Sequence, residues 1–188
     1  MKYVYTFLVL LLSVPMLGFG QLSGTKQVPS VNYPGLQAVV DSLNSQGVGS
    51  SGVSFIIAGS QVFNEPFLTL TASGTENGPV EIKWDESGDK PIVNFTGTAA
   101  AGEAGISLSG SDYITINGLD IRNPDGLLEY GVLISNADEL NGAHHNAIKN
   151  CVITLNKTNV NQTEAVRVFA TTVPTNASGT VSFNSFIN

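Results

Sequence analysis

Apolar and polar residues alternate through residues 113–123, and this stretch sets the expectation for the whole chain. Ile114 and Ile116 lie two residues apart, which is typical of a half-buried strand. Asn117-Gly118 interrupts the pattern, and the alternation then resumes. Gly accepts a positive φ readily, so a bend there would let both strands present apolar residues to one interior. The stretch predicts two consecutive strands of a coil, not a hairpin.

The pattern recurs twice, each time with a small or positive-φ-tolerant residue at the predicted bend. The inward residues are Ile116, Ile148 and Phe183, and the bends are Gly118, Asn150 and Ser185. Third strands are predicted between these recurrences, at 131–134 and 165–169, and earlier strands at 53–57, 67–71, 80–84, 91–95 and 106–108. Such repetition is the mark of a solenoid.

One amphipathic helix is predicted ahead of the strands, at about residues 34–45. Its apolar stripe follows helical spacing and consists of Leu36, Val39, Val40 and Leu43. Asn32 is the predicted N-cap, and Gly47 is expected to end the helix. We expect this helix to cover one end of the β-core, because exposed strand edges invite aggregation.

These patterns predict an all-β chain, a parallel β-helix with an N-terminal capping helix. The domain is expected over residues 21–188, with rungs from about 53 to 188. The alternative is an antiparallel β-sandwich, which also uses short strands and turns. Two-residue hairpin loops are scarce in the sequence, and the bend at Asn117-Gly118 keeps the apolar parity of its flanking strands, so the solenoid is preferred.

The N-terminal pattern predicts a signal peptide over residues 1–20. Lys2 precedes an apolar run at residues 7–12, and Gly18-Phe19-Gly20 offers a small-x-small cleavage site. The alternative is a membrane anchor, but the run is short for a bilayer and no basic cluster follows it. We therefore expect a secreted, extracellular or cell-surface protein with no membrane span after signal cleavage.

Charge and cysteine content narrow the function classes. The net charge is −7, and it would be near −8 after loss of Lys2 with the leader, since residues 1–20 hold no acid. Binding of nucleic-acid phosphates needs a basic face, so this acidic composition argues against nucleic acid as a partner. Cys151 is the one cysteine, so no internal disulfide can form. It occupies an inward position equivalent to Leu119 and is interpreted as a small core residue.

Four stretches carry a resemblance to a known group: residues 32–43, 53–59, 113–121 and 146–156. They resemble the helical cap, the following strand and the rungs of right-handed parallel β-helix proteins of the pectate-lyase-like superfamily. More narrowly, the chain resembles the N-terminal part of large secreted bacterial surface proteins exported by the type IX route. This resemblance implies a right-handed coil. Because the chain ends at Asn188 within a recognisable rung, we expect the β-helix to be incomplete, a fragment of something longer.

Asp120 and Arg122 are the first candidate for chemistry, because both are predicted to point outward from one strand. Their predicted neighbours on the next rung are Val152 and Thr154, so no stack of acids builds up. An inverting sugar hydrolase needs two carboxyl groups about 6.5–9.5 Å apart. A solvated ion pair is therefore preferred over a carbohydrate or metal site.

Other candidates lie around the third strand. Asp125, Glu129, Asp138 and Glu139 could bind Ca²⁺, although no EF-hand spacing is present. His144-His145 is the only histidine pair, and adjacent strand residues face opposite ways, so a turn contact is expected rather than a shared metal. Tyr113 and Trp84 are interpreted equally as sugar-stacking or packing residues.

Two function hypotheses follow. The first is a non-catalytic β-helix segment with structural, adhesive or carbohydrate-contacting use, whose partners are extracellular polysaccharide or cell-surface components. The alternative is the N-terminal part of a polysaccharide lyase or glycoside hydrolase whose catalytic rungs lie beyond the chain end. No cofactor is expected beyond the possible Ca²⁺.

Overall fold

The chain is mostly parallel β-sheet in the computed structural model, which describes residues 20–98, 100–124 and 126–188. The first sheet has the order β1 (Leu22–Val28), β2 (Val48–Ile57), β5 (Val80–Trp84), β8 (Ile114–Asn117), β12 (Ala147–Lys149) and β16 (Ser185–Ile187). The second has the order β13 (Val152–Leu155), β9 (Asp120–Asn123), β6 (Ile92–Phe95) and β3 (Val62–Glu65). The third has the order β14 (Glu164–Phe169), β10 (Tyr130–Ser135), β7 (Ala104–Ser109) and β4 (Leu68–Leu70).

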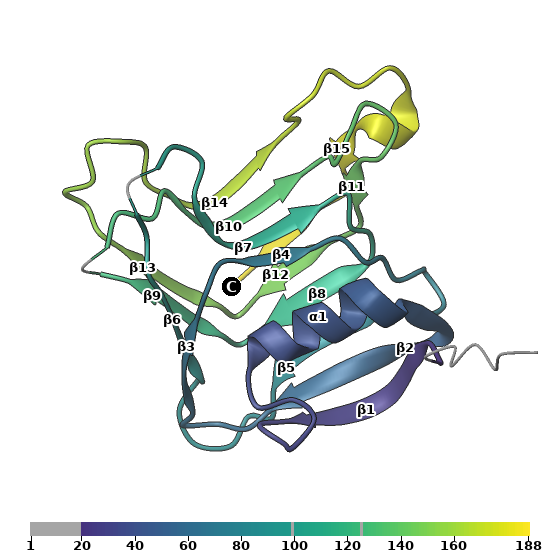
Figure 1. The fold of residues 1–188 in the computed structure, drawn as a ribbon, viewed down its shortest axis with the longest axis vertical. Coiled ribbons are helices and arrows are strands. Elements are labelled where there is room, and N and C mark those ends of the chain that lie inside the picture. Colours follow the sequence, from purple (N-terminus) through teal and green to yellow (C-terminus); the bar gives the residue numbers. More distant parts are fainter. Residues whose placement is uncertain (1–19, 99, 125) are drawn as a thin grey trace, which may run out of the picture.

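From β2 onward the chain visits these three sheets in turn, and every strand pairing in them is parallel. A small parallel pair, β11 (Ala143–His144) with β15 (Val181–Ser182), is added between the third and first sheets, and η1 (Ala177–Gly179) precedes β15. Figure 1 shows the three sheets on three sides of a common interior. The all-β prediction is confirmed, and the arrangement is compatible with a β-helix or another solenoid.

Inward side chains from successive strands stack in register to form the core. Ile82, Ile116 and Ile148 are paired neighbours in the first sheet and are at most 5% exposed. Thr115, one residue from Ile116, is only half-buried. Burying each large aliphatic side chain stabilises the fold by about 1.5–3 kcal/mol. The predicted inward parity of Ile116 is therefore confirmed.

The predicted capping helix is present as α1 (Leu36–Gln46) and packs against β1, β3 and β4. These are the edge strands at one end of the three sheets, and α1 crosses in front of this end in Figure 1. All four residues of its apolar stripe are buried, and Gly47 ends it with φ +70. A helix that covers the edges protects them from pairing with other chains.

The helix start is a correction to the sequence prediction. Asn32 does not cap α1. The N-cap residue is Gly35, which has no side chain that could accept a capping hydrogen bond. The carboxylate of Glu65 on β3 accepts hydrogen bonds from Leu36 N at 2.6 Å and Gln37 N at 3.2 Å. A carboxylate at this end satisfies free N–H groups and complements the helix dipole. A residue distant in sequence therefore supplies the cap.

The bends were predicted correctly in two of three cases. Gly118 has φ +82 and Asn150 has φ +49, and a Cβ on Gly118 would lie 2.9 Å from the Trp84 side chain. Ser185 is not a bend, because it lies in β16 opposite Ala147, and Phe186 rather than Phe183 pairs with Ile148. The longer loop before β16 shifts the third repeat by three residues, which periodicity alone did not reveal.

Two strand assignments also differ from the sequence prediction. The first sheet begins before residue 53, because β1 pairs with β2 from Leu22 and Val48 onward. No strand was predicted between residues 57 and 67, yet residues 62–65 form β3 and pair with β6. Short edge strands carry few residues with a clear period, so tertiary pairing decides them.

Buried asparagines bridge the turns of successive strands. Asn146 is 1% exposed; its Oδ1 accepts from Ile114 N, and its Nδ2 donates to Ser111 O at 2.7 Å. Asn123 is 3% exposed and in the same way donates to Phe95 O and accepts from Leu128 N. These side chains satisfy backbone groups where the sheet ladders end.

Candidate functional site

Asp120 and Arg122 form the expected ion pair on β9. Arg122 Nε donates to Asp120 Oδ1 at 2.9 Å, and Arg122 Nη2 donates to Asp120 Oδ2 at 2.5 Å. The Arg122 side chain is 41% exposed, whereas that of Asp120 is only 12% exposed, so the acid is less solvated than predicted. The hydrogen bonds that Arg122 donates to Asp120 raise the pKa of Arg122 above its ordinary value. The pair is a fixed, bidentate arrangement.

Strand register places other polar side chains beside Arg122 on the outer face of the second sheet. Asn64 is opposite Asn94, Asn94 is opposite Arg122, and Arg122 is opposite Thr154. Paired strands lie about 4.8 Å apart, so these four side chains form one outward row across four strands. The predicted neighbour Thr154 is confirmed, as is Val152 opposite Asp120.

Three residues of the polar row line a hollow of about 450 Å³ that we call the outer groove, and Thr154 continues the row beyond it. Asn64, Asn94 and Arg122 line it from β3, β6 and β9, and the turns after β6 and β9 contribute Thr96 and Pro124 among others. Asn94 Nδ2 donates to Asn64 Oδ1 at 3.1 Å. The arrangement offers amide and guanidinium groups side by side, which suits a polar ligand lying across the strands.

Of the acids considered for Ca²⁺, the three in the described part of the chain, Glu129, Asp138 and Glu139, do not form one site. Glu129 precedes β10, is 5% exposed and accepts a hydrogen bond from Gly102 N at 2.6 Å. Asp138 follows β10 and accepts from Leu140 N and Asn141 N, both at 2.8 Å. Asp125 lies outside the described residues.

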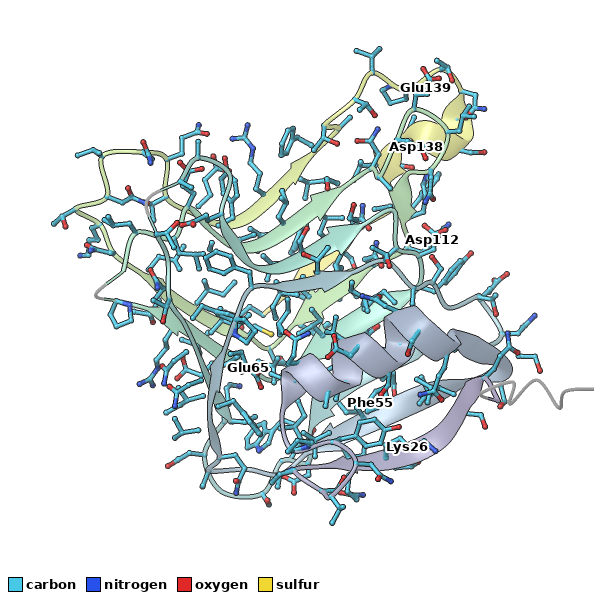
Figure 2. The ribbon with its side chains drawn as sticks, in the orientation of Figure 1. Lys26, Phe55, Glu65, Asp112, Asp138 and Glu139 are labelled. Carbon is cyan, nitrogen blue, oxygen red and sulfur yellow. The ribbon has the colours of Figure 1, made fainter. Side chains whose placement is uncertain are left out.

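Figure 2 places Asp138 and Glu139 together at a turn, well away from Glu65 at the start of α1. Among residues 20–98, 100–124 and 126–188, no group of three or more His, Cys, Asp or Glu side chains is arranged to hold a metal ion. Asp138 instead caps its own turn through backbone N–H groups.

His144 joins three successive turns. Asp112 Oδ1 accepts from His144 N at 2.7 Å and lies 3.1 Å from His144 Nδ1, while His144 Nε2 lies 3.4 Å from Thr180 Oγ1. This order of carboxylate, imidazole and hydroxyl is that of a hydrolase triad. The Thr180 hydroxyl, however, donates to Ala177 O at 2.7 Å, so its proton is directed away from the imidazole. The contact holds turns together, as the sequence suggested.

Aromatic side chains stack along the same corner. His145 lies between Tyr113, at a centroid distance of 4.7 Å, and Phe183, at 5.0 Å. All three residues have positive φ values of 55° to 58°.

Trp84 packs elsewhere. Trp84 Nε1 donates to Ser87 O, and Lys90 Nζ lies 5.1 Å from the centroid of the Trp84 ring. Tyr113 and Trp84 are thus both engaged in packing within the chain.

Cys151 behaves as the sequence indicated. It is half-buried, packs against the hydrophobic core, and its Sγ donates to Lys149 O at 3.2 Å. Burial raises the pKa of the Cys151 thiol, which keeps the thiol protonated and weakly nucleophilic.

Sequence reasoning identified Arg122 but missed Asn64 and Asn94. Asn64 lies between the buried Phe63 and the half-buried Glu65, and Asn94 lies between the buried Val93 and Phe95. The outward position of Asn94 was available from that alternation. Its proximity to Asn64 was not, because β3 had not been recognised as a strand.

Comparison of the chain with family models, curated proteins and solved structures found no significant match. In the described residues, no helix has both the length and the apolar character needed to cross a bilayer.

Proposed function

We propose that this chain is a right-handed parallel β-helix segment of a secreted or cell-surface protein, and that it contacts polysaccharide through the outer groove without cleaving it. The single observation that carries this proposal is the polar row of Asn64, Asn94, Arg122 and Thr154, which crosses successive strands on one face. A linear polymer lying across the strands would meet one side chain per strand. Amides and a guanidinium match the hydroxyl and ring oxygens of sugars.

The right-handed coil is supported by general topology. Parallel strands that enter the same sheet after a crossover are joined in a right-handed sense in about 98% of cases. The membership in the pectate-lyase-like superfamily rests on the resemblance of residues 32–43 and 113–121. Export by the type IX route rests on the same resemblance and on the leader at residues 1–20.

A binding role is favoured over catalysis because Asp120 is engaged. Both of its oxygens accept hydrogen bonds from Arg122. A carboxylate held in this way is a poor proton acceptor for a substrate, and the guanidinium cannot serve as an acid near neutral pH. The pair therefore positions donors for a ligand.

The test measures binding and cleavage in the same samples. The purified protein is run through gels containing single soluble polysaccharides, and each mixture is assayed for new reducing ends and unsaturated products. We expect retardation by at least one polysaccharide, loss of that retardation in Arg122→Ala, and no products. Arg167→Ala is the matched control, because Arg167 is also paired with an acid, Glu164, but lies on the third sheet. Product formation would contradict the non-catalytic proposal.

Export is tested separately by expressing the chain in a host with a secretion system. N-terminal sequencing of the protein recovered outside the cell is expected to begin at Gln21. Recovery only within the cell, with Met1 retained, would contradict the proposed leader.

A further inference from the structure

We infer that the polysaccharide contacted by the outer groove is neutral and rich in hydroxyl groups, rather than a polymer of uronic acids. The inference rests on the proposed function and adds the class of ligand. It comes from the charge balance of the groove, its mixture of donors and acceptors, and the apolar row beside it.

The only charge among the described lining residues is already compensated. This charge is on Arg122, whose Nε and Nη2 donate hydrogen bonds to Asp120 at 2.9 and 2.5 Å. A guanidinium has five N–H groups, so three are left for a ligand. A uronate carboxylate would meet an ion pair with no net charge rather than a free cation. Hydrogen bonding is available here, whereas net attraction for an anion is not.

The charge of the whole chain acts in the same direction. Fifteen acidic residues outnumber eight basic ones, which gives the net charge of −7. At low ionic strength such a surface repels a polyanion over a distance of tens of ångströms. A neutral polymer meets no such barrier.

The amides of the groove provide acceptors as well as donors. Asn94 Nδ2 donates to Asn64 Oδ1, which leaves the Asn94 amide oxygen and the Asn64 amide N–H groups for a ligand. A sugar hydroxyl both donates and accepts, so it can satisfy either group. A carboxylate only accepts, so it could not pair with the amide oxygen of Asn94.

A largely apolar row runs beside the polar one. Val62 is opposite Ile92, Ile92 is opposite Asp120, and Asp120 is opposite Val152. Val62 is 58% exposed and Val152 is 45% exposed. Neutral pyranose rings present C–H faces that can cover such side chains, while their hydroxyls reach the polar row. The outer face therefore matches both surfaces of a neutral sugar.

The experiment compares neutral polymers (dextran, galactomannan, xyloglucan) with acidic ones (polygalacturonate, alginate) by titration calorimetry at low and physiological ionic strength. We expect at least one neutral polymer to bind with an affinity that hardly changes with salt. Arg122→Ala and Asn94→Ala are each expected to weaken it by about tenfold, which corresponds to one good hydrogen-bonded contact. Polygalacturonate is expected to bind more weakly at both ionic strengths.

Two substitutions should reverse the preference. Asp120→Asn keeps the side-chain shape but frees the charge of Arg122, and Thr154→Arg adds an unpaired cation at an exposed position opposite Arg122. Each is expected to raise polygalacturonate affinity at least about tenfold at low salt, with the gain lost at higher salt. Thr154→Arg changes an exposed residue, so it keeps the test valid if Asp120→Asn unfolds.

The outcomes separate the two proposals. Tighter binding of an acidic than of any neutral polymer, lost in Arg122→Ala, would overturn the neutral-ligand inference and leave the proposed function standing. Binding of neither class by the unchanged, folded protein would overturn the proposed function itself. Salt-independent neutral binding with the reversal in the two variants would support both.

Discussion

Asparagines occur at the turns between strands and in the outer groove, and the two regions use the same side chain differently. At the turns, Asn146 is 1% exposed and its amide bonds to backbone groups of a neighbouring turn. Asn123 borders the groove, but it is only 3% exposed and its amide is bonded to backbone groups in the same way. In the groove, Asn64 is exposed, Asn94 is half-buried, and the two share one hydrogen bond with each other. The turn asparagines are committed to the fold, whereas the groove asparagines keep capacity for a ligand.

This difference teaches where stability and function can be separated. A buried amide replaced by an apolar group leaves backbone donors and acceptors without partners, at a cost of about 1–3 kcal/mol each. An exposed amide that is removed is replaced by water, at little cost. Substitutions at the turns should therefore lower the free energy of unfolding and leave ligand binding unchanged. Substitutions in the groove should weaken ligand binding and leave the free energy of unfolding unchanged.

The largest effect is expected from Ile116→Asp, which extends the comparison to the inward side of a strand. The substitution loses about 1.5–3 kcal/mol of side-chain burial and adds the cost of a buried carboxylate. Thr115→Asp, one residue away and half-buried on the outward side, should be nearly silent. Thermal unfolding of both variants is the measurement, and equal effects would refute the inward parity of Ile116.

Asn146→Ala should come next, because it strips Ile114 N and Ser111 O of their partners in a buried turn. We expect destabilisation of at least about 1–3 kcal/mol in denaturant unfolding. Asn94→Ala is the matched groove variant and should stay within about 0.5 kcal/mol of the unchanged protein. A larger loss for Asn94→Ala than for Asn146→Ala would contradict the distinction between the two regions.

Glu65→Ala tests the contact between β3 and the capping helix. Loss of the carboxylate frees Leu36 N and Gln37 N and should cost about 1 kcal/mol, as for other N-cap losses. Glu76→Ala removes an equal charge at an exposed turn and should change stability by less than about 0.5 kcal/mol. Urea denaturation of both variants, followed by helical circular dichroism, distinguishes a lost cap from a general charge effect.

The smallest expected effect concerns pH. A hydrogen bond from Lys83 lowers the pKa of Glu81 below its ordinary value of 4.5. A carboxyl group whose pKa is lower in the folded than in the unfolded state stabilises the fold at any pH above its unfolded-state pKa. This stabilisation is lost as the pH falls through the folded-state pKa. Glu81→Gln should therefore slightly flatten the loss of stability below about pH 4.5 in thermal melts. A steeper acid limb in that variant would contradict the assignment.

Periodicity predicted most of the fold, because strand alternation and the helical stripe are local properties of the chain. The positive φ at Gly118 and Asn150 followed from residue type. The third repeat was placed three residues early, since the longer loop before β16 carries no periodic signal of its own. The N-cap was misassigned to Asn32 because the true capping group, Glu65, lies far along the chain.

In the candidate site, the ion pair could be predicted from the sequence, whereas its neighbouring residues were identified only from the structure. Spacing alone placed Asp120 and Arg122 on one outward face, where they pair. It did not place Asn64 or Asn94 beside them, because those neighbours depend on the register between β3, β6 and β9. Of the Ca²⁺ candidates, Glu129 and Asp138 lie beyond opposite ends of β10, a separation that the sequence pattern did not reveal.

The sequence by itself therefore determined which residues face inward, since a period of two assigns each side chain to one side of its strand. It also determined where the chain can bend, through residue types that accept positive φ. Only the tertiary structure decided which outward residues become neighbours, because stacking sets the register across strands that are about thirty residues apart in the chain. An asparagine looks the same in either region of the sequence, and its partners decide whether it holds the fold or lines the groove.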